Sequence, residues 1–182
     1  MMRKIARLII FGFLIFNVTN CKTVEKKKPN PNPPKVEFDS YYLGKSDFPE
    51  PKGFINDYEL IFTPEEQVKL TNIIKEFEKK TSNQIAVVTI KSIGKYTDFD
   101  KYAVDLSDYW KIGQYNKDNG LTIILSKTLK KIRISTGNQT EHILTDEICM
   151  KILSDKIIPE LKKGEYYNGI EIGLTELIKN WK

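Results

Sequence analysis

One segment, residues 85–90, limits the folds open to this chain more than any other. It is a continuous run of apolar and β-branched side chains without the polar alternation of a half-exposed strand. Such a run is typical of a strand that is buried on both faces. The rest of the chain must therefore supply layers that cover both sides of a sheet.

Helical patterns flank this run on both sides. Thr63, Pro64 and Glu66 provide an N-cap, a proline at the first helical position and the acid of a capping box. Apolar residues then recur at helical spacing, which predicts a helix over 64–80. The same spacing predicts a second helix over 98–111, carried by Phe99, Tyr102, Ala103, Leu106 and Trp110.

The second half of the chain predicts a hairpin followed by further helices. Residues 121–125 and 131–136 flank a short polar segment, a pattern typical of two antiparallel strands. Thr145 can cap a third helix, which Pro159 breaks or restarts. A last helix follows Gly164 and carries Ile170, Leu174, Leu177, Ile178 and Trp181.

The order of these elements predicts the fold class. Two strands separated by a helix pair in parallel through a right-handed crossover, whereas the hairpin adds an antiparallel pair. We therefore expect an α/β fold with helices on both faces of a small mixed sheet.

The first twenty residues predict an export signal. A basic stretch ending at Arg7 precedes nine apolar residues, too few for a helix that spans a bilayer, which needs about 20. Polar residues then lead to Cys21, a position typical of a bacterial lipobox cysteine, which is lipidated, for example with palmitate, and becomes the first residue once the leader is cleaved off. Ordinary cleavage with an unmodified thiol is the alternative, although the segment has no Ala-x-Ala-like site.

The segment after Cys21 predicts a tether. Residues 22–35 hold five Lys and four Pro, a composition that stays extended. These lysines could contact anionic headgroups or simply keep the tether solvated. We predict a signal peptide over 1–20, a lipidated cysteine and tether over 21–53 and a folded domain over 54–182. The predicted location is the bacterial cell envelope, with the domain lipid-anchored and facing the periplasm or the exterior.

The net charge of +5 belongs to this leader and tether. From Val36 onward the chain holds 21 basic and 23 acidic side chains, and its single arginine is Arg133. Surfaces that read nucleic acid need several converging Arg or Lys side chains. The sequence therefore argues against a nucleic-acid partner.

Polar side chains are expected at one edge of the sheet. Because the hairpin is antiparallel, the start of its first strand and the end of its second share an edge, which gathers Asp118 and Asn119 with residues 137–141. Asp105 and Asp108 end the preceding helix and are expected there too. Hard cations such as calcium prefer such oxygen ligands. The alternative is a simple turn before a strand, and the spacing lacks the full EF-hand loop.

Seven motifs in order resemble the TPM domain, a family named for a thylakoid lumen protein, a photosystem II repair protein and a nematode acetylcholine-receptor modulator. They lie at 56–58, 63–66, 85–90, 109–113, 117–121, 132–137 and 144–146. The resemblance implies a three-layer α/β/α sandwich, residence outside the cytoplasm and frequent membrane attachment. It also implies a divalent-metal site, calcium in some members, at Asp57, Asp118 and Asn119, to which we add Asp108 for its expected place at the same edge.

The resemblance also raises acid phosphatase activity, proposed for some plant members. Cys149 and His142 lack the neighbouring arginine of cysteine- and histidine-based phosphatases, and Arg133 could position an anion or pair with an acid. The predicted function is therefore a cation-binding interaction module for envelope or membrane proteins. A weak metal-dependent acid phosphatase and a structural envelope lipoprotein without metal are the alternatives.

Overall fold

The computed structural model describes residues 48–114 and 116–181. The predicted signal peptide, Cys21 and most of the predicted tether lie outside the described residues, so these predictions stay predictions. Within the described part, no helix is both long enough and apolar enough to cross a membrane.

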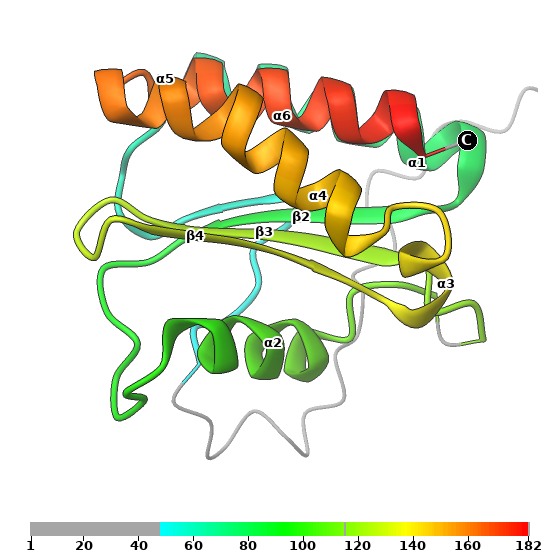
Figure 1. The fold of residues 1–182 in the computed structure, drawn as a ribbon, viewed down its shortest axis with the longest axis horizontal. Coiled ribbons are helices and arrows are strands. Elements are labelled where there is room, and N and C mark those ends of the chain that lie inside the picture. Colours follow the sequence, from blue (N-terminus) through cyan, green and yellow to red (C-terminus); the bar gives the residue numbers. More distant parts are fainter. Residues whose placement is uncertain (1–47, 115, 182) are drawn as a thin grey trace, which may run out of the picture. The chain divides into compact units, whose positions relative to one another are not determined.

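The centre of the domain is a four-stranded mixed sheet (Figure 1). The strands stand in sequence order; the first three are parallel and the fourth is antiparallel to the third. Their bounds are β1 Ile55–Asp57, β2 Gln84–Thr89, β3 Gly120–Ser126 and β4 Lys131–Thr136. The predicted parallel pair and the hairpin are confirmed, whereas β1 was not predicted because three residues are too few to show a period.

Helices cover both faces of this sheet. On one face lies α2 (Phe99–Trp110), and on the other lie α1 (Pro64–Thr81), α4 (Asp146–Ile152), α5 (Ile158–Lys163) and α6 (Tyr166–Asn180) (Figure 1). A further single turn, α3 (Asn138–Glu141), follows β4. The predicted three-layer α/β/α sandwich with a small mixed sheet is therefore confirmed.

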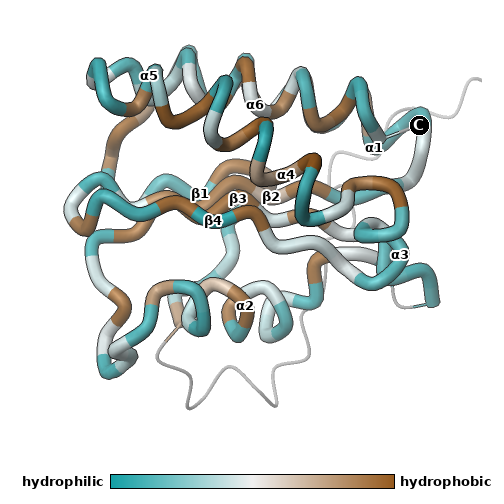
Figure 2. The backbone as a smooth tube through the Cα atoms, viewed as in Figure 1, coloured by the Kyte–Doolittle hydropathy of each residue, from teal (hydrophilic) through white to brown (hydrophobic). Residues whose placement is uncertain are grey.

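Strand β2 shows why its sequence requires two covering layers. Ile85 and Val87 pack into the larger core with α1 and α6, whereas Val88 packs into the smaller core with α2. All three side chains are at most 2% exposed. The hydropathy colouring shows apolar stretches in the strands between helices in which hydrophilic and hydrophobic residues alternate (Figure 2).

The predicted helix signals act as expected at α1, and at Pro159 the second of the two predicted outcomes occurs. The Thr63 hydroxyl accepts from the Glu66 N–H, and the Glu66 carboxylate accepts from the Thr63 N–H, which completes the capping box. Pro159 restarts a helix rather than ending one: a π-helical turn over Leu153–Ile157 joins α4 to α5. A proline ring clashes with the carbonyl four residues earlier, and the wider turn relieves that clash.

Candidate metal site at the acidic end of the sheet

The start of β3 and the end of β4 share one edge of the sheet, as predicted. Leu121 pairs with Thr136, and the Gly137 N–H donates to the Gly120 carbonyl at 2.9 Å. The loop that precedes β3 and the loop that follows β4 therefore meet here. We call this edge the acidic end of the sheet.

A concavity of about 240 Å³ opens at the acidic end, between the last turns of α2 and the strands β3 and β4. Four carboxylates line it, and all four residues are exposed. They are Asp108, Asp118, Glu141 and Asp146. The hydroxyl groups of Ser107, Thr122, Ser135 and Thr136 line it as well, so the walls carry oxygen atoms from four segments of the chain.

Asp118 joins the two loops that form this concavity. Its backbone is in the left-handed region, at φ 46°. Its Oδ2 atom accepts from the Asn138 N–H at 3.0 Å, and its carbonyl accepts from the Gln139 N–H at 3.2 Å. Asp118 therefore satisfies the free N–H groups at the start of α3, and one of its carboxylate oxygens is already engaged.

Two glycines allow the backbones to approach at the acidic end. A Cβ atom on Gly120 would lie 1.8 Å from the Ile112 carbonyl oxygen, and one on Gly137 would lie 2.3 Å from the Asp118 carbonyl oxygen. No side chain fits at such separations. The shape of the concavity thus depends on backbone packed directly against backbone.

The side chain of Asn119 connects two loops through hydrogen bonds. Its side-chain oxygen accepts from the Gln114 N–H at 2.9 Å, and its amide donates to the Ser82 carbonyl at 2.9 Å and to the Asn83 side chain at 3.0 Å. Asn119 is only 7% exposed and does not line the concavity. Its polar atoms hold the loop before β3 against the loop before β2.

Asp57 lies at the other end of the sheet from Asp118. It pairs with Thr89 at the end of β2, whereas Gly120 pairs with Gln84 at the start of that strand. Thr89 and Gln84 are five residues apart along β2, which corresponds to about 17 Å. One ion cannot bind both carboxylates, so a site that combines Asp57 with Asp118 is excluded by the sheet register.

The contacts of Asp57 explain why an acid is present there. Its two oxygens accept from the Ile61 N–H at 3.1 Å and the Phe62 N–H at 2.8 Å, and the Thr89 hydroxyl donates to Oδ1. The side chain is 8% exposed. Asp57 therefore closes the turn between β1 and α1, a role that the sequence alone did not distinguish from metal binding.

Asp105 also lies away from the concavity, contrary to the prediction. Its carboxylate accepts from Lys101 Nζ at 2.8 Å and from the Tyr96 hydroxyl at 2.9 Å. The hydrogen bond from Lys101 and then the one from Tyr96 lower the pKa of this carboxyl. Helix α2 lines the concavity with Val104, Ser107 and Asp108, and Asp105 is rotated about 100° around the helix axis from Val104.

Arg133 does line the concavity, and it pairs with an acid. Its Nη1 atom lies 3.5 Å from Asp100 Oδ1, so the pairing expected for this single arginine is confirmed. Its Nε atom is buried without a hydrogen-bond partner among the described residues. The positive charge of Arg133 partly offsets the four carboxylates of the concavity.

The donor set fits a hard cation, but the side chains do not form a closed coordination shell. The four acids and the neighbouring hydroxyl groups offer only oxygen atoms as metal ligands. Calcium takes six to eight oxygen ligands. Within residues 48–114 and 116–181, no three His, Cys, Asp or Glu side chains stand close enough to hold a metal ion. An ion here would need waters, or movement of the exposed carboxylates, to complete its shell.

The site differs from the predicted one in its members. Asp108 and Asp118 share the concavity as expected, whereas Asp57 and Asn119 belong to other contacts. Glu141 was predicted at this edge but not as a ligand, and Asp146 was not predicted there. The capping residue Thr145 was the available signal, because it places Asp146 at the start of α4, directly after the loop that follows β4.

A family model of the TPM domain matches residues 55–180 of this sequence. The chain belongs to the TPM-domain family. This TPM domain contains both the acidic end and the hairpin at the opposite end of the sheet. A comparison with curated proteins gives no match.

Solved structures share the fold of this TPM domain. The solution NMR structure of the N-terminal domain of a protein from P. gingivalis is 23% identical with a TM-score of 0.63, and the match covers 70% of this chain and 80% of that one. The BA42 protein from Bizionia argentinensis is 22% identical with a TM-score of 0.60 over 69% and 88% of the two chains. The N-terminal domain of the cg2496 protein from Corynebacterium glutamicum is 14% identical with a TM-score of 0.57 over 76% and 86%. At these identities the likeness extends to the fold alone.

Proposed function

We propose that this TPM domain is a lipid-anchored module of the bacterial cell envelope that binds a divalent cation, calcium first, and contacts an envelope or membrane protein. The observation that carries the proposal is the convergence of four carboxylates in one small concavity. Cys21 would supply the lipid anchor, and the domain would face the periplasm or the exterior.

Electrostatics favours a cation in this concavity. The four acidic residues that line it carry charge of the same sign, and a divalent ion bound among them would offset part of that charge. The affinity should be low, because the acids are exposed and the shell is completed by water. Extracellular calcium modules with loose shells bind at about 10⁻⁴ to 10⁻³ M, and we expect this range here.

The four acids come from four different segments of the chain, and a cation bound to them would link these segments. Asp108 lies in the last turns of α2, Asp118 in the loop before β3, Glu141 in α3 and Asp146 at the start of α4. A bound ion would reduce the motion of these four segments relative to one another. The partner would then meet a surface whose shape depends on calcium.

NMR titration of the mature chain, from residue 21 onward with Cys21→Ser, tests this proposal. Millimolar calcium should shift the amide signals of residues 116–120 and 137–146 in a saturable manner. Replacing two carboxylates together, Asp118→Asn with Glu141→Gln, should weaken calcium binding about tenfold, since each removes one charged ligand.

Glu76→Gln is the matched control because Glu76 is an exposed acid on α1, outside the concavity. It should leave the calcium affinity unchanged. Absence of shifts at the acidic end, or equal losses of affinity in the control and the double variant, would overturn cation binding at this site.

A further inference from the structure

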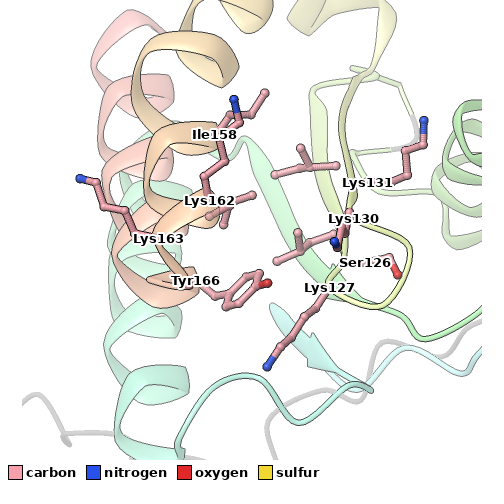
Figure 3. Close-up of a pocket in the computed structure, with 12 residues that line it drawn as sticks. Ser126, Lys127, Lys130, Lys131, Ile158, Lys162, Lys163 and Tyr166 are labelled. Carbon is pink, nitrogen blue, oxygen red and sulfur yellow. The ribbon is translucent and has the colours of Figure 1, made fainter.

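A second cavity, of about 630 Å³, lies at the opposite end of the sheet from the acidic concavity. One wall is the segment from α5 to the start of α6, and the other is the β3–β4 hairpin (Figure 3). We call it the lysine cavity. It shares no lining residue with the acidic concavity.

The floor of the lysine cavity is apolar. Leu125 and Ile132 come from the two strands, and Ile158 and Leu161 come from α5. Tyr166 adds an aromatic ring from the first turn of α6, which points from the helical wall toward the hairpin (Figure 3). Ile132, Ile158, Leu161 and Tyr166 are only half-buried, so they leave apolar surface open to a ligand.

The rim of the same cavity is cationic. Among the residues that the structure describes, the lining includes five lysines and no acid: Lys127, Lys130, Lys131, Lys162 and Lys163. Each of the five is exposed. The charges come from two walls that are far apart in sequence, so the fold itself brings them together around the apolar floor.

Neighbouring groups engage only part of this positive charge. Lys163 Nζ lies 2.7 Å from Glu160 Oε1, and Lys127 Nζ lies 5.2 Å from the centre of the Tyr166 ring. Glu59 accepts from the N–H groups of the hairpin turn, which holds the turn in place. In the part of the chain that the structure describes, Lys130, Lys131 and Lys162 have no acidic partner within ion-pair distance.

We propose that the lysine cavity binds a single-chain anionic amphiphile of the fatty-acid class. The acyl chain would lie on the floor formed by Ile158, Leu161 and the Tyr166 ring, and the carboxylate would lie among Lys130 and Lys162. The volume falls within the range of about 300 to 1,000 Å³ that is usual for small-molecule sites.

Both chemical features of the cavity are needed to select this ligand. A small anion such as phosphate would leave the apolar floor in water, and a neutral lipid would gain no attraction from the lysine charges. Lysine suits the role, because its methylene stem extends the apolar wall while its ammonium group stays at the rim. An anion with one acyl chain satisfies the floor and the rim together.

Titration of the mature chain with dodecanoate, kept below its micellar concentration, tests the proposal by calorimetry and NMR. One dodecanoate should bind per chain, with shifts at Ile158, Leu161 and Tyr166 and none at residues 116–120. Octanoate should bind at least tenfold more weakly, because it buries four fewer methylene groups. Lys130→Gln combined with Lys162→Gln should weaken dodecanoate binding about fivefold.

Lys75→Gln combined with Lys79→Gln is the matched control, since both lysines are exposed on α1 and line neither cavity. It should change the dodecanoate affinity less than twofold. Dodecyl maltoside tests the need for charge and inorganic phosphate tests the need for a chain; both should bind far more weakly than dodecanoate.

Several results would overturn the proposal. These are equal binding of dodecanoate and dodecyl maltoside, equal binding of octanoate and dodecanoate, or the same affinity in the double variant and the wild type. Binding to anionic phosphatidylglycerol vesicles without binding of monomeric dodecanoate would instead indicate a membrane-docking surface, and it would also overturn the pocket. Calcium binding at the acidic end can fail or succeed independently of these outcomes.

Discussion

The two ends of strand β3 differ in charge, in size and in how the chain builds them. At Gly120 the strand begins beside a polar concavity of about 240 Å³ with four carboxylates, and at Ser126 it ends beside a cavity of about 630 Å³ with five lysines. About 20 Å of strand separates the two. A folded part with almost no net charge thus carries two local fields of opposite sign.

The connections explain why the two ends differ. At the acidic end, loops that enter and leave the sheet pack backbone on backbone, which leaves little space and exposes polar atoms. At the lysine end, a tight hairpin closes the strands, and α5 and α6 stand apart from it across an apolar gap. Contacts between backbone segments therefore determine the size of the concavity at the acidic end, whereas side chains determine the size of the lysine cavity.

Matched glycine substitutions test this difference, and Gly120→Ala should have the largest effect of all. Its new Cβ atom would lie 1.8 Å from the Ile112 carbonyl oxygen, so the backbone must move, at a cost of about 3 kcal/mol or more in unfolding free energy. Gly164 lies at the lysine end with open space around it and φ at 87°. Gly164→Ala should cost only about 1 kcal/mol, for its left-handed backbone.

Urea unfolding of both variants measures these costs. Calcium titration of Gly120→Ala should also show loss of the acidic site, while Gly164→Ala should keep it. Equal destabilisation by the two substitutions would contradict the proposal that close backbone contacts shape the acidic end but not the lysine end.

Asp57→Asn tests whether Asp57 stabilises the fold rather than binding a metal ion, as its distance from the acidic concavity implies. The carboxylate accepts from two backbone N–H groups and the Thr89 hydroxyl, and an amide leaves at least one of these buried donors unpaired. We expect a loss of about 2 kcal/mol in unfolding free energy. The calcium affinity of the folded protein should not change, as measured by the same NMR titration.

A fall in calcium affinity without a fall in stability would reverse this assignment and make Asp57 a ligand. Asp118→Asn is the comparison variant, since it should weaken calcium binding with a smaller effect on stability. The Asp118 side chain is exposed, and one hydrogen bond to the Asn138 N–H depends on it.

These two acids also show how far the sequence could predict the molecule. The apolar run at 85–90, the capping box at Thr63 and the hairpin pattern are local signals, and they predicted the layers and the pairing of β2, β3 and β4. Strand β1 gave no such signal, because Asn56 and Asp57 are polar yet buried. Without β1, the sequence did not show at which end of the sheet Asp57 lies. Asp57 was therefore predicted to be a metal ligand, although its carboxylate closes the turn between β1 and α1.

The lysine cavity could not be predicted from local patterns for a related reason. Lys130 and Lys162 are 32 positions apart, and each belongs to a short basic run that is ordinary in a solvated turn or helix end. Only the packing of α5 beside the hairpin brings the two runs around one apolar floor. Sites made by two distant segments depend on tertiary packing, which a single sequence shows only in part.

The smallest predicted effect concerns Cys149, which lies next to the acidic end. Its side chain is 7% exposed, and burial, followed by the nearby charge of Asp146, raises the pKa of the thiol from 9.0 to about 11. The folded state therefore keeps the thiol proton at a pH where the unfolded chain loses it. The contribution of Cys149 to the unfolding free energy should therefore fall as the pH rises from 9, by about 1 kcal/mol between pH 9 and pH 10.

Urea unfolding of the wild type and of Cys149→Ala at pH 8, 9 and 10 measures this loss as the difference between the two proteins. Tyr58, Tyr102 and Tyr167, whose pKa values also rise from 10.0 to about 12, together add a similar loss over this range, but they contribute equally to both proteins and cancel in the difference. Calcium in the acidic concavity would neutralise Asp146 and reduce the Cys149 effect, whereas dodecanoate in the lysine cavity would not. An equal response to both ligands would mean that the two ends of β3 are coupled, and would contradict their separation into independent sites.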